Sequence, residues 1–291
     1  MSHGKRACAL ALASVLCGGC LVEPSPSASS VNTGATVNNS RVEVAPSPSP
    51  ETSPTPSTVG EADGELESYM RAAAESLVPE QRAALGRVNT DARRLLALRG
   101  YLRAGRDAAS RWAWSRERIE SYEKSPEYAA ALAEIEKVRH EFESANPSYT
   151  LRVNTQVRSL DEQLSKWNEN DSVARAGDEL LARAREELAA SSYASAPSAA
   201  DVQRFQRFLR STTTHATPTL AVPGLSPHGQ SRAFDFQVMH GSQLVAGPSS
   251  PGAWDSEGWT EKVHAAVTRA STKFKGPLAS PREPWHYDYK P

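Results

Sequence analysis

The stretch Ala233-Phe234-Asp235-Phe236-Gln237-Val238 decides the fold of the C-terminal part of the chain. Apolar and polar side chains alternate along it, and this period of two predicts a strand whose phenylalanines lie on a buried face. Asp235 then lies on the opposite face. A short strand holds a carboxylate rigidly, so Asp235 is a candidate for a binding or catalytic site.

Two neighbouring clusters supply matching side chains. His228 precedes Asp235 by seven residues in a loop flanked by proline and glycine, and Glu283-Pro284-Trp285-His286 lies near the end of the printed sequence. Two histidines and an aspartate can occupy three corners of a zinc tetrahedron and leave the fourth for water. A glutamate that is not itself a ligand can accept the proton of that water, which is the role we expect for Glu283.

Cysteine does not compete for this metal. The cysteines are Cys8, Cys17 and Cys20, so the remainder of the chain has no thiolate ligand. Any metal bound there must use histidine, aspartate or glutamate. The net charge of −1 and the hydrophobic content of 39% describe an ordinary globular chain, without the basic excess typical of nucleic-acid binding.

The two clusters resemble the motifs of a known family. Ser226 to Asp235 is similar to the S-x-H-x-x-G-x-A-x-D signature of the D-alanyl-D-alanine carboxypeptidase-like zinc peptidases of the VanX and VanY type, and Glu283 to His286 resembles their closing E-x-W-H motif. The resemblance covers about residues 150–291. It implies that His228, Asp235 and His286 bind Zn²⁺ and that Glu283 is the general base and acid.

The family also has an arginine in an Arg-Ser pair before the first zinc histidine, where it stabilises the developing oxyanion. Leu209-Arg210-Ser211 is the segment that we matched to it, although it lacks the Gly-Tyr before and the glutamine after the pair. Arg210 is therefore expected to be the oxyanion donor, with a surface charge ending a helix as the alternative. Ser226 either binds substrate or caps the loop. Ser231 replaces the usual glycine, which a negative φ would allow.

The N-terminus resembles a targeting segment. Lys5 and Arg6 precede an apolar run from Ala7 to Leu16, and small residues precede Cys20, as in a bacterial lipoprotein signal. We expect a signal peptide over residues 1–19, lipidation of Cys20 and a location in the cell envelope facing the cell wall; an ordinary cleaved signal is the alternative. The Pro/Ser/Thr-rich residues 20–62 predict a disordered tether that extends on the order of 100 Å.

The fold class predicted for the rest is α+β. Residues 63–148 are expected to form a helical region, and residues 149–291 a zinc-peptidase domain with a short antiparallel sheet and flanking helices. Within this scheme, apolar side chains at helical spacing predict a helix across residues 153–167: Val153, Val157, Leu160, Leu164 and Trp167.

These features predict a zinc D-alanyl-D-alanine carboxypeptidase acting on peptidoglycan stem peptides. The alternatives are an endopeptidase of the same family, a non-catalytic cell-wall-binding lipoprotein, and a helical interaction protein of the envelope. A carboxypeptidase needs a cation or amide to bind the terminal carboxylate of its substrate. The sequence pattern singles out no residue for that role.

Overall fold

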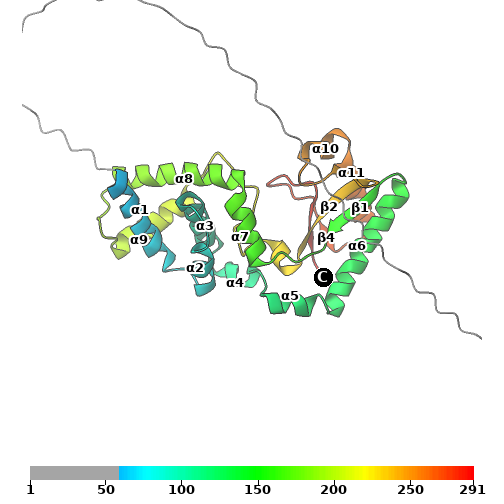
Figure 1. Cartoon of the computed structure of the whole chain (residues 1–291), viewed down its shortest axis with the longest axis horizontal. Helices are drawn as coiled ribbons and strands as arrows, with labels where there is room; N and C mark the ends of the chain where they lie inside the picture. The colour runs from blue at the N-terminus through cyan, green and yellow to red at the C-terminus, as the bar shows by residue number, and fades with distance from the viewer. Residues whose placement is uncertain (1–58) are drawn as a thin grey trace, which may run out of the picture. The chain divides into compact units, whose positions relative to one another are not determined.

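The computed structural model describes residues 59–291 (Figure 1). The expected signal segment, the lipidation site Cys20 and the tether as far as residue 58 lie outside the described residues. The first helix already begins at Val59, within the last residues of the expected tether. No helix in the described range is both long and apolar enough to cross a membrane.

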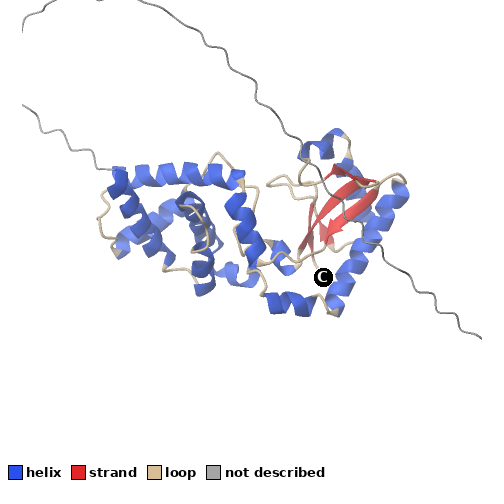
Figure 2. Ribbon diagram, in the orientation of Figure 1, coloured by secondary structure: helices blue, strands red, loops and turns tan. Residues whose placement is uncertain are grey.

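The described chain is α+β, as the sequence predicted (Figure 2). The α-helices are α1 Val59–Ala74, α2 Pro79–Leu85, α3 Asp91–Ala104, α4 Ala108–Arg111, α5 Arg116–Tyr122, α6 Pro126–Ala145, α7 Leu160–Glu169, α8 Asp171–Ala190, α9 Ala199–Ser211, α10 Pro251–Ser256 and α11 Trp259–Ala270. Two 3₁₀ turns are η1 Gly105–Asp107 and η2 Pro227–Gln230, and the strands are β1 Thr150–Asn154, β2 Ala233–His240, β3 Gln243–Ala246, β4 Phe274–Lys275 and β5 His286–Tyr289.

Local sequence signals explain where many helices begin. Proline occupies the first position of α2 and α6, where its fixed φ favours the helix and its missing N–H costs nothing. A serine, threonine or asparagine side chain accepts a hydrogen bond from the first turn of several helices, and these N-caps are Thr90, Ser115, Ser125, Ser159, Asn170 and Ser198.

The sheet is antiparallel, in the order β1-β2-β5-β4, and β3 also pairs with β2. Strand β2 is the predicted strand around Asp235, and its phenylalanines Phe234 and Phe236 are buried as expected. Asp235 lies directly opposite His286 of β5 on one side and Asn154 of β1 on the other. Helices α6 and α11 pack against each other and beside the sheet (Figure 1).

Two hydrophobic cores organise the described chain. The helical core takes buried residues from Leu66 to Ala108 and again from Leu164 to Leu225, whereas the sheet core takes those from Ala131 to Leu151 and from Phe234 to Tyr289. The boundary expected between residues 148 and 149 therefore does not separate the two cores. Helix α6 belongs to the sheet, and helices α7, α8 and α9 belong to the helical core.

The single helix predicted across residues 153–167 is wrong. Val153 lies in β1, Val157 lies in an extended segment, and α7 begins only at Leu160 after the N-cap Ser159. The spacing of the apolar residues suggested one helix because a strand, a short connector and a helix together place apolar side chains at intervals of three and four residues. Tertiary pairing of β1 with β2 decides the conformation here.

Candidate metal centre

Three buried side chains converge at the centre of the sheet. His228, Asp235 and His286 are 7%, 5% and 6% exposed. The Nε2 of His228 lies 3.2 Å from the Nδ1 of His286, and Asp235 Oδ1 lies 3.4 Å from the first nitrogen and 3.3 Å from the second. The three atoms thus form a nearly equilateral triangle, and together they could hold a metal ion.

The size of this triangle fits a tetrahedral ion. Ligand atoms about 2.0–2.2 Å from Zn²⁺ lie roughly 3.3–3.6 Å from one another in tetrahedral geometry. The Oδ1 of Asp235 is buried and has no hydrogen-bond partner in the described chain. A buried carboxylate oxygen without a partner is costly, and a cation at the centre of the triangle would satisfy it.

Pairing of two strands positions two of these ligands. Asp235 and His286 are directly opposite each other in the antiparallel register of β2 and β5, so their side chains leave the same face of the sheet. The next residue of β5, Tyr287, is fully buried in the sheet core and anchors the strand from the other face. The ligand pair is therefore as rigid as the sheet itself.

The third ligand is carried by the turn η2. The carbonyl of His228 accepts a hydrogen bond from the N–H of Arg158 at 3.1 Å, and the carbonyl of Gly229 accepts one from Trp114 at 3.0 Å. A Cβ at Gly229 would lie 2.8 Å from the Cβ and 3.1 Å from the Cα of Ala113, so glycine permits this close approach. Packing from other segments of the chain thereby fixes His228.

Ser231 has a left-handed backbone conformation, which glycine adopts without strain. Its φ of 52° and ψ of 31° are left-handed, rather than the negative φ under which we expected serine to be tolerated. Its side chain is 4% exposed, and its hydroxyl has no hydrogen-bond partner in the described chain. The turn geometry is thus kept at the cost of local backbone strain.

An arginine that the sequence analysis missed contacts the site. Arg158 Nη2 donates to Asp235 Oδ2, the oxygen that does not face the histidines. This contact leaves Oδ1 free for a metal and fixes the plane of the carboxylate. Gln163 in turn donates to the carbonyl of Arg158 at 2.9 Å and accepts from the N–H of Gly224 at 2.9 Å.

The signal for this residue was in the sequence. Arg158 and Ser159 form an Arg-Ser pair with a glutamine, Gln163, a few residues later, which is the pattern that the segment around Arg210 lacks. Assignment of residues 153–167 to one helix concealed it. The error in secondary structure therefore caused the omission at the site.

The structure does not bring Arg210 to the metal centre. Its side chain is exposed at the end of α9, where Nε donates to the carbonyl of Leu102 at 3.2 Å. Arg210 is thus a surface charge at the end of a helix, which is the alternative that the sequence analysis left open. Ser226, by contrast, lies two residues before His228 and is 9% exposed, and its hydroxyl does not cap η2.

Two more carboxylates surround His286. The Oε2 of Glu283 lies 3.6 Å from its Nδ1, on the side that faces the other ligands, whereas Asp288 Oδ1 lies 3.3 Å from its Nε2. Glu283 is half-buried, and burial raises the pKa of its carboxyl above the ordinary value. A glutamate with a raised pKa beside a metal position is suited to accept and return a proton.

The charges of the centre favour a cation. Burial lowers the pKa of His228 to about 3, so its ring is neutral and can act as a ligand. Burial also opposes protonation of His286, but the neighbouring carboxylates of Asp235 and Asp288 outweigh it and raise the pKa of His286 to about 9. A ring that attracts a proton so strongly lies in a negative field, and this field also attracts a metal ion.

Comparison with models of known protein families, with curated proteins and with solved structures finds no match to this chain. The description of the site therefore rests on its own residues and on the two sequence motifs.

Proposed function

We propose that this chain is a zinc-dependent peptidase that hydrolyses peptide bonds in peptidoglycan stem peptides, as a D-alanyl-D-alanine carboxypeptidase. The observation that carries the proposal is the triangle of His228 Nε2, Asp235 Oδ1 and His286 Nδ1, with sides of 3.2–3.4 Å, beside a half-buried glutamate. The resemblance of both motifs to the zinc peptidases supplies the substrate class.

The donor set supports zinc as the metal. Two imidazoles and one carboxylate are typical of catalytic zinc sites that keep one position open. When bound, Zn²⁺ would polarise the scissile carbonyl and lower the pKa of a water at the open position. In the described chain, the group of candidate ligands comprises only these three residues, which favours an open site over a closed structural one.

Glu283 would act as the proton carrier. Its carboxylate lies beside the triangle rather than within it, so it can take a proton from the attacking water and deliver it to the leaving amine. The raised pKa supports the second step, because a carboxyl that holds its proton more strongly is present in the acid form at higher pH.

Arg158 takes the place that the sequence analysis gave to Arg210. Its guanidinium has several N–H donors, of which one binds Asp235 Oδ2. The remaining donors are available to a substrate oxygen on which negative charge develops. Arg158 thus combines the positioning of a metal ligand with a candidate oxyanion contact.

Access to peptidoglycan is part of the proposal. The targeting segment, Cys20 and the Pro/Ser/Thr-rich tether would place the enzyme in the cell envelope, attached to a membrane and within reach of the cell wall. This part depends on the sequence alone, since those residues lie outside the described range.

Metal content and hydrolysis test the proposal together. Purified protein is expected to contain one zinc per chain and to release D-alanine from a stem pentapeptide, as measured by elemental analysis and mass spectrometry. Release of a peptide fragment from cross-linked muropeptides without free D-alanine would indicate the endopeptidase instead. Zinc without any cleavage would indicate a binding protein, and absence of zinc would overturn the proposal.

A further inference from the structure

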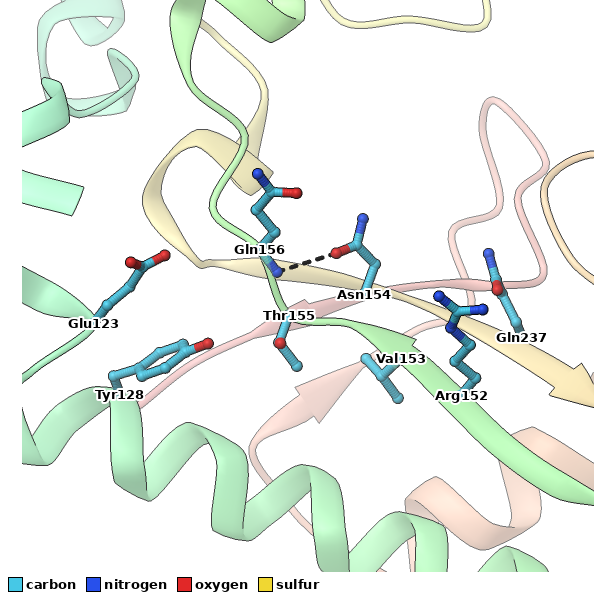
Figure 3. Close-up of a pocket in the computed structure, with 8 residues that line it drawn as sticks. All are labelled: Glu123, Tyr128, Arg152, Val153, Asn154, Thr155, Gln156 and Gln237. Carbon is cyan, nitrogen blue, oxygen red and sulfur yellow. Dashed lines mark hydrogen bonds between the residues drawn. The ribbon is translucent and has the colours of Figure 1, made fainter. Parts of the chain in front are cut away.

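A cavity of about 610 Å³ adjoins the metal centre, because its Asn154 lies directly opposite Asp235 in the register of β1 and β2 (Figure 3). Most of its lining comes from β1 and the residues that follow this strand. The cavity therefore extends the site already described. A different group of charged side chains lies in the helical part of the chain, and it includes Arg210, which the structure does not bring to the metal centre.

Three arginine side chains gather where α3 and α9 end. Arg99 Nη1 and Arg103 Nη2 both donate to the carbonyl of Thr212, at 3.2 Å and 2.7 Å. These two nitrogens therefore lie within about 6 Å of each other. Arg103 Nε also donates to the carbonyl of Arg210 at 2.8 Å, and Arg210 Nε donates to the carbonyl of Leu102 at 3.2 Å. The C-terminal ends of the two helices are thus joined by arginines from both sides.

The charges of these arginines are not balanced by carboxylates. None of the three forms an ion pair within residues 59–291, and their partners are neutral carbonyls. Other arginines of α3, α8 and α9 do form ion pairs, and these pairs are Arg94 with Asp91, Arg183 with Glu179, and Arg204 with Asp201. Each helix C-terminus contributes about half a negative charge. Two helix ends therefore offset about one of the three positive charges.

The innermost of the three guanidinium groups is buried. Arg99 is 6% exposed, and burial, together with the charge of Arg103, lowers the pKa of Arg99 to about 10, so it stays charged at neutral pH. A buried charge without a counter-ion is costly. The charge of Glu179 acts on Arg99, but the oxygens of Glu179 already accept the N–H groups of His215 and Ala216. An anion from solvent would supply the missing counter-charge.

Hydrogen-bond donors remain free at this surface. A guanidinium has five N–H donors, and the hydrogen bonds within the described residues use one of Arg99, two of Arg103 and one of Arg210. Arg103 and Arg210 are exposed, so their remaining donors reach solvent. Thr213 and Thr214 follow in the loop after α9, and their hydroxyls form no hydrogen bond within the described chain. Guanidinium and hydroxyl donors together are typical of contacts to phosphate.

We propose that Arg103 and Arg210, supported by the charge of Arg99, bind a phosphate group at the surface where α3 and α9 end. A phosphate ester has up to two negative charges and several acceptor oxygens, so it matches the remaining positive charge and can accept from two guanidinium groups at once. A carboxylate has one charge and matches less well. The headgroup of an anionic phospholipid and a soluble phosphate ester share this chemistry. The site is separate from the metal centre and does not depend on the proposed peptidase.

Two binding measurements on the full chain test the site. Calorimetric titration with inorganic phosphate at low ionic strength, where screening is weak, detects a soluble ligand. Cosedimentation with vesicles of phosphatidylglycerol detects a lipid headgroup. Arg210→Gln is expected to weaken binding about fivefold, the scale of one guanidinium at an anionic surface, and the double variant with Arg103→Gln is expected to weaken it further. Arg116→Gln, which changes an exposed arginine of α5, is the control and should bind as the wild type does.

The outcomes distinguish the two sources of phosphate. Binding of inorganic phosphate that weakens in Arg210→Gln supports the site for a soluble ester, and vesicle binding alone that weakens in the same variant supports it for a lipid headgroup. Absence of both kinds of binding overturns the inference, as does binding that is equally strong in Arg210→Gln and the wild type. Circular dichroism establishes that each variant is folded, and Arg210→Gln decides the question if the double variant does not fold. The proposed peptidase is unaffected by either result, because Arg210 does not contact the metal centre.

Discussion

The carboxylate of Asp288 lies 3.3 Å from His286 Nε2, the ring nitrogen on the opposite side from the metal position. Asp288 follows His286 by two residues in β5, so both side chains leave the same face of the strand. In the proposed zinc site, Asp288 would orient the ring of His286 and hold its proton on the outer nitrogen. A carboxylate in this relation makes the inner nitrogen a stronger ligand.

Asp288→Asn is expected to weaken zinc binding by about tenfold to hundredfold, because the amide keeps the shape of the side chain and loses its charge. Competition with a chelator of known affinity measures the change. Asp178→Asn, at an exposed position of α8, is the control and should bind zinc as the wild type does. Equal zinc affinity in the two variants would show that Asp288 does not support His286.

Glu283→Gln is expected to keep one zinc per chain and to lower kcat by about 10²–10⁴-fold, since the side chain no longer accepts a proton. His286→Ala is expected to lose both zinc and activity. Elemental analysis and D-alanine release, measured on the same preparations, check both expectations. An active Glu283→Gln variant would contradict the proposed role of Glu283 as the proton carrier.

Ser231→Gly is expected to raise the free energy of unfolding by about 1 kcal/mol, because glycine adopts a positive φ without strain. Ser231→Ala keeps the left-handed backbone and removes only the unpartnered hydroxyl, so its effect should be smaller. Denaturant titration of the three proteins measures the difference. If alanine stabilises as much as glycine, the buried hydroxyl rather than the backbone is the source of the strain.

Glu179 makes the stability of the fold depend on pH. Its carboxylate accepts the N–H groups of His215 and Ala216 at 2.8–3.1 Å, and these hydrogen bonds lower its pKa from 4.5 to about 2. A lowered pKa stabilises the fold above the unfolded value of about 4.5, and this contribution is lost as the pH falls toward 2. Glu179→Gln should therefore be less stable than the wild type at pH 7.

Denaturant midpoints between pH 7 and pH 2 check this expectation. The difference between Glu179→Gln and the wild type should shrink as the pH falls below about 4.5. Glu186→Gln, another glutamate of α8, is the control and should show a much smaller difference at every pH. If the difference in midpoint between Glu179→Gln and the wild type stays constant from pH 7 to pH 2, the loss of stability in the variant does not come from the charge of Glu179.

The residues of the proposed zinc site could be predicted from sequence because their spacing and residue types are specific. Alternation along β2 correctly placed Asp235 opposite the buried phenylalanines, and the two motifs selected the histidines that the structure brings together. Asp288 was not predicted, since an aspartate after a histidine at this spacing is common on any exposed strand. The strand conformation of β5 places its carboxylate 3.3 Å from the ring.

Local spacing favoured Arg158 over Arg210, because Gln163 follows the pair Arg158-Ser159, but the helix expected across residues 153–167 concealed it. Val153 and Val157 fit a helical stripe with Leu160, and nothing in the segment alone shows that β2 recruits residues 150–154 as a strand. The N-cap Ser159 could have corrected the expected start of this helix, because a serine before a run with helical spacing marks the start of a helix. Starting the helix there would have left Arg158 in a connector.

The two interleaved cores have a consequence for the metal centre. The chain passes between them at residues 109–130, 154–159 and 226–233, so neither core is a contiguous piece that can be removed by truncation. His228 and Arg158 both belong to these connecting segments, whereas Asp235 and His286 belong to the sheet. One of the three candidate ligands is thus carried by a segment that joins the two cores, and the other two are carried by the sheet, so the packing of both cores determines the shape of the triangle.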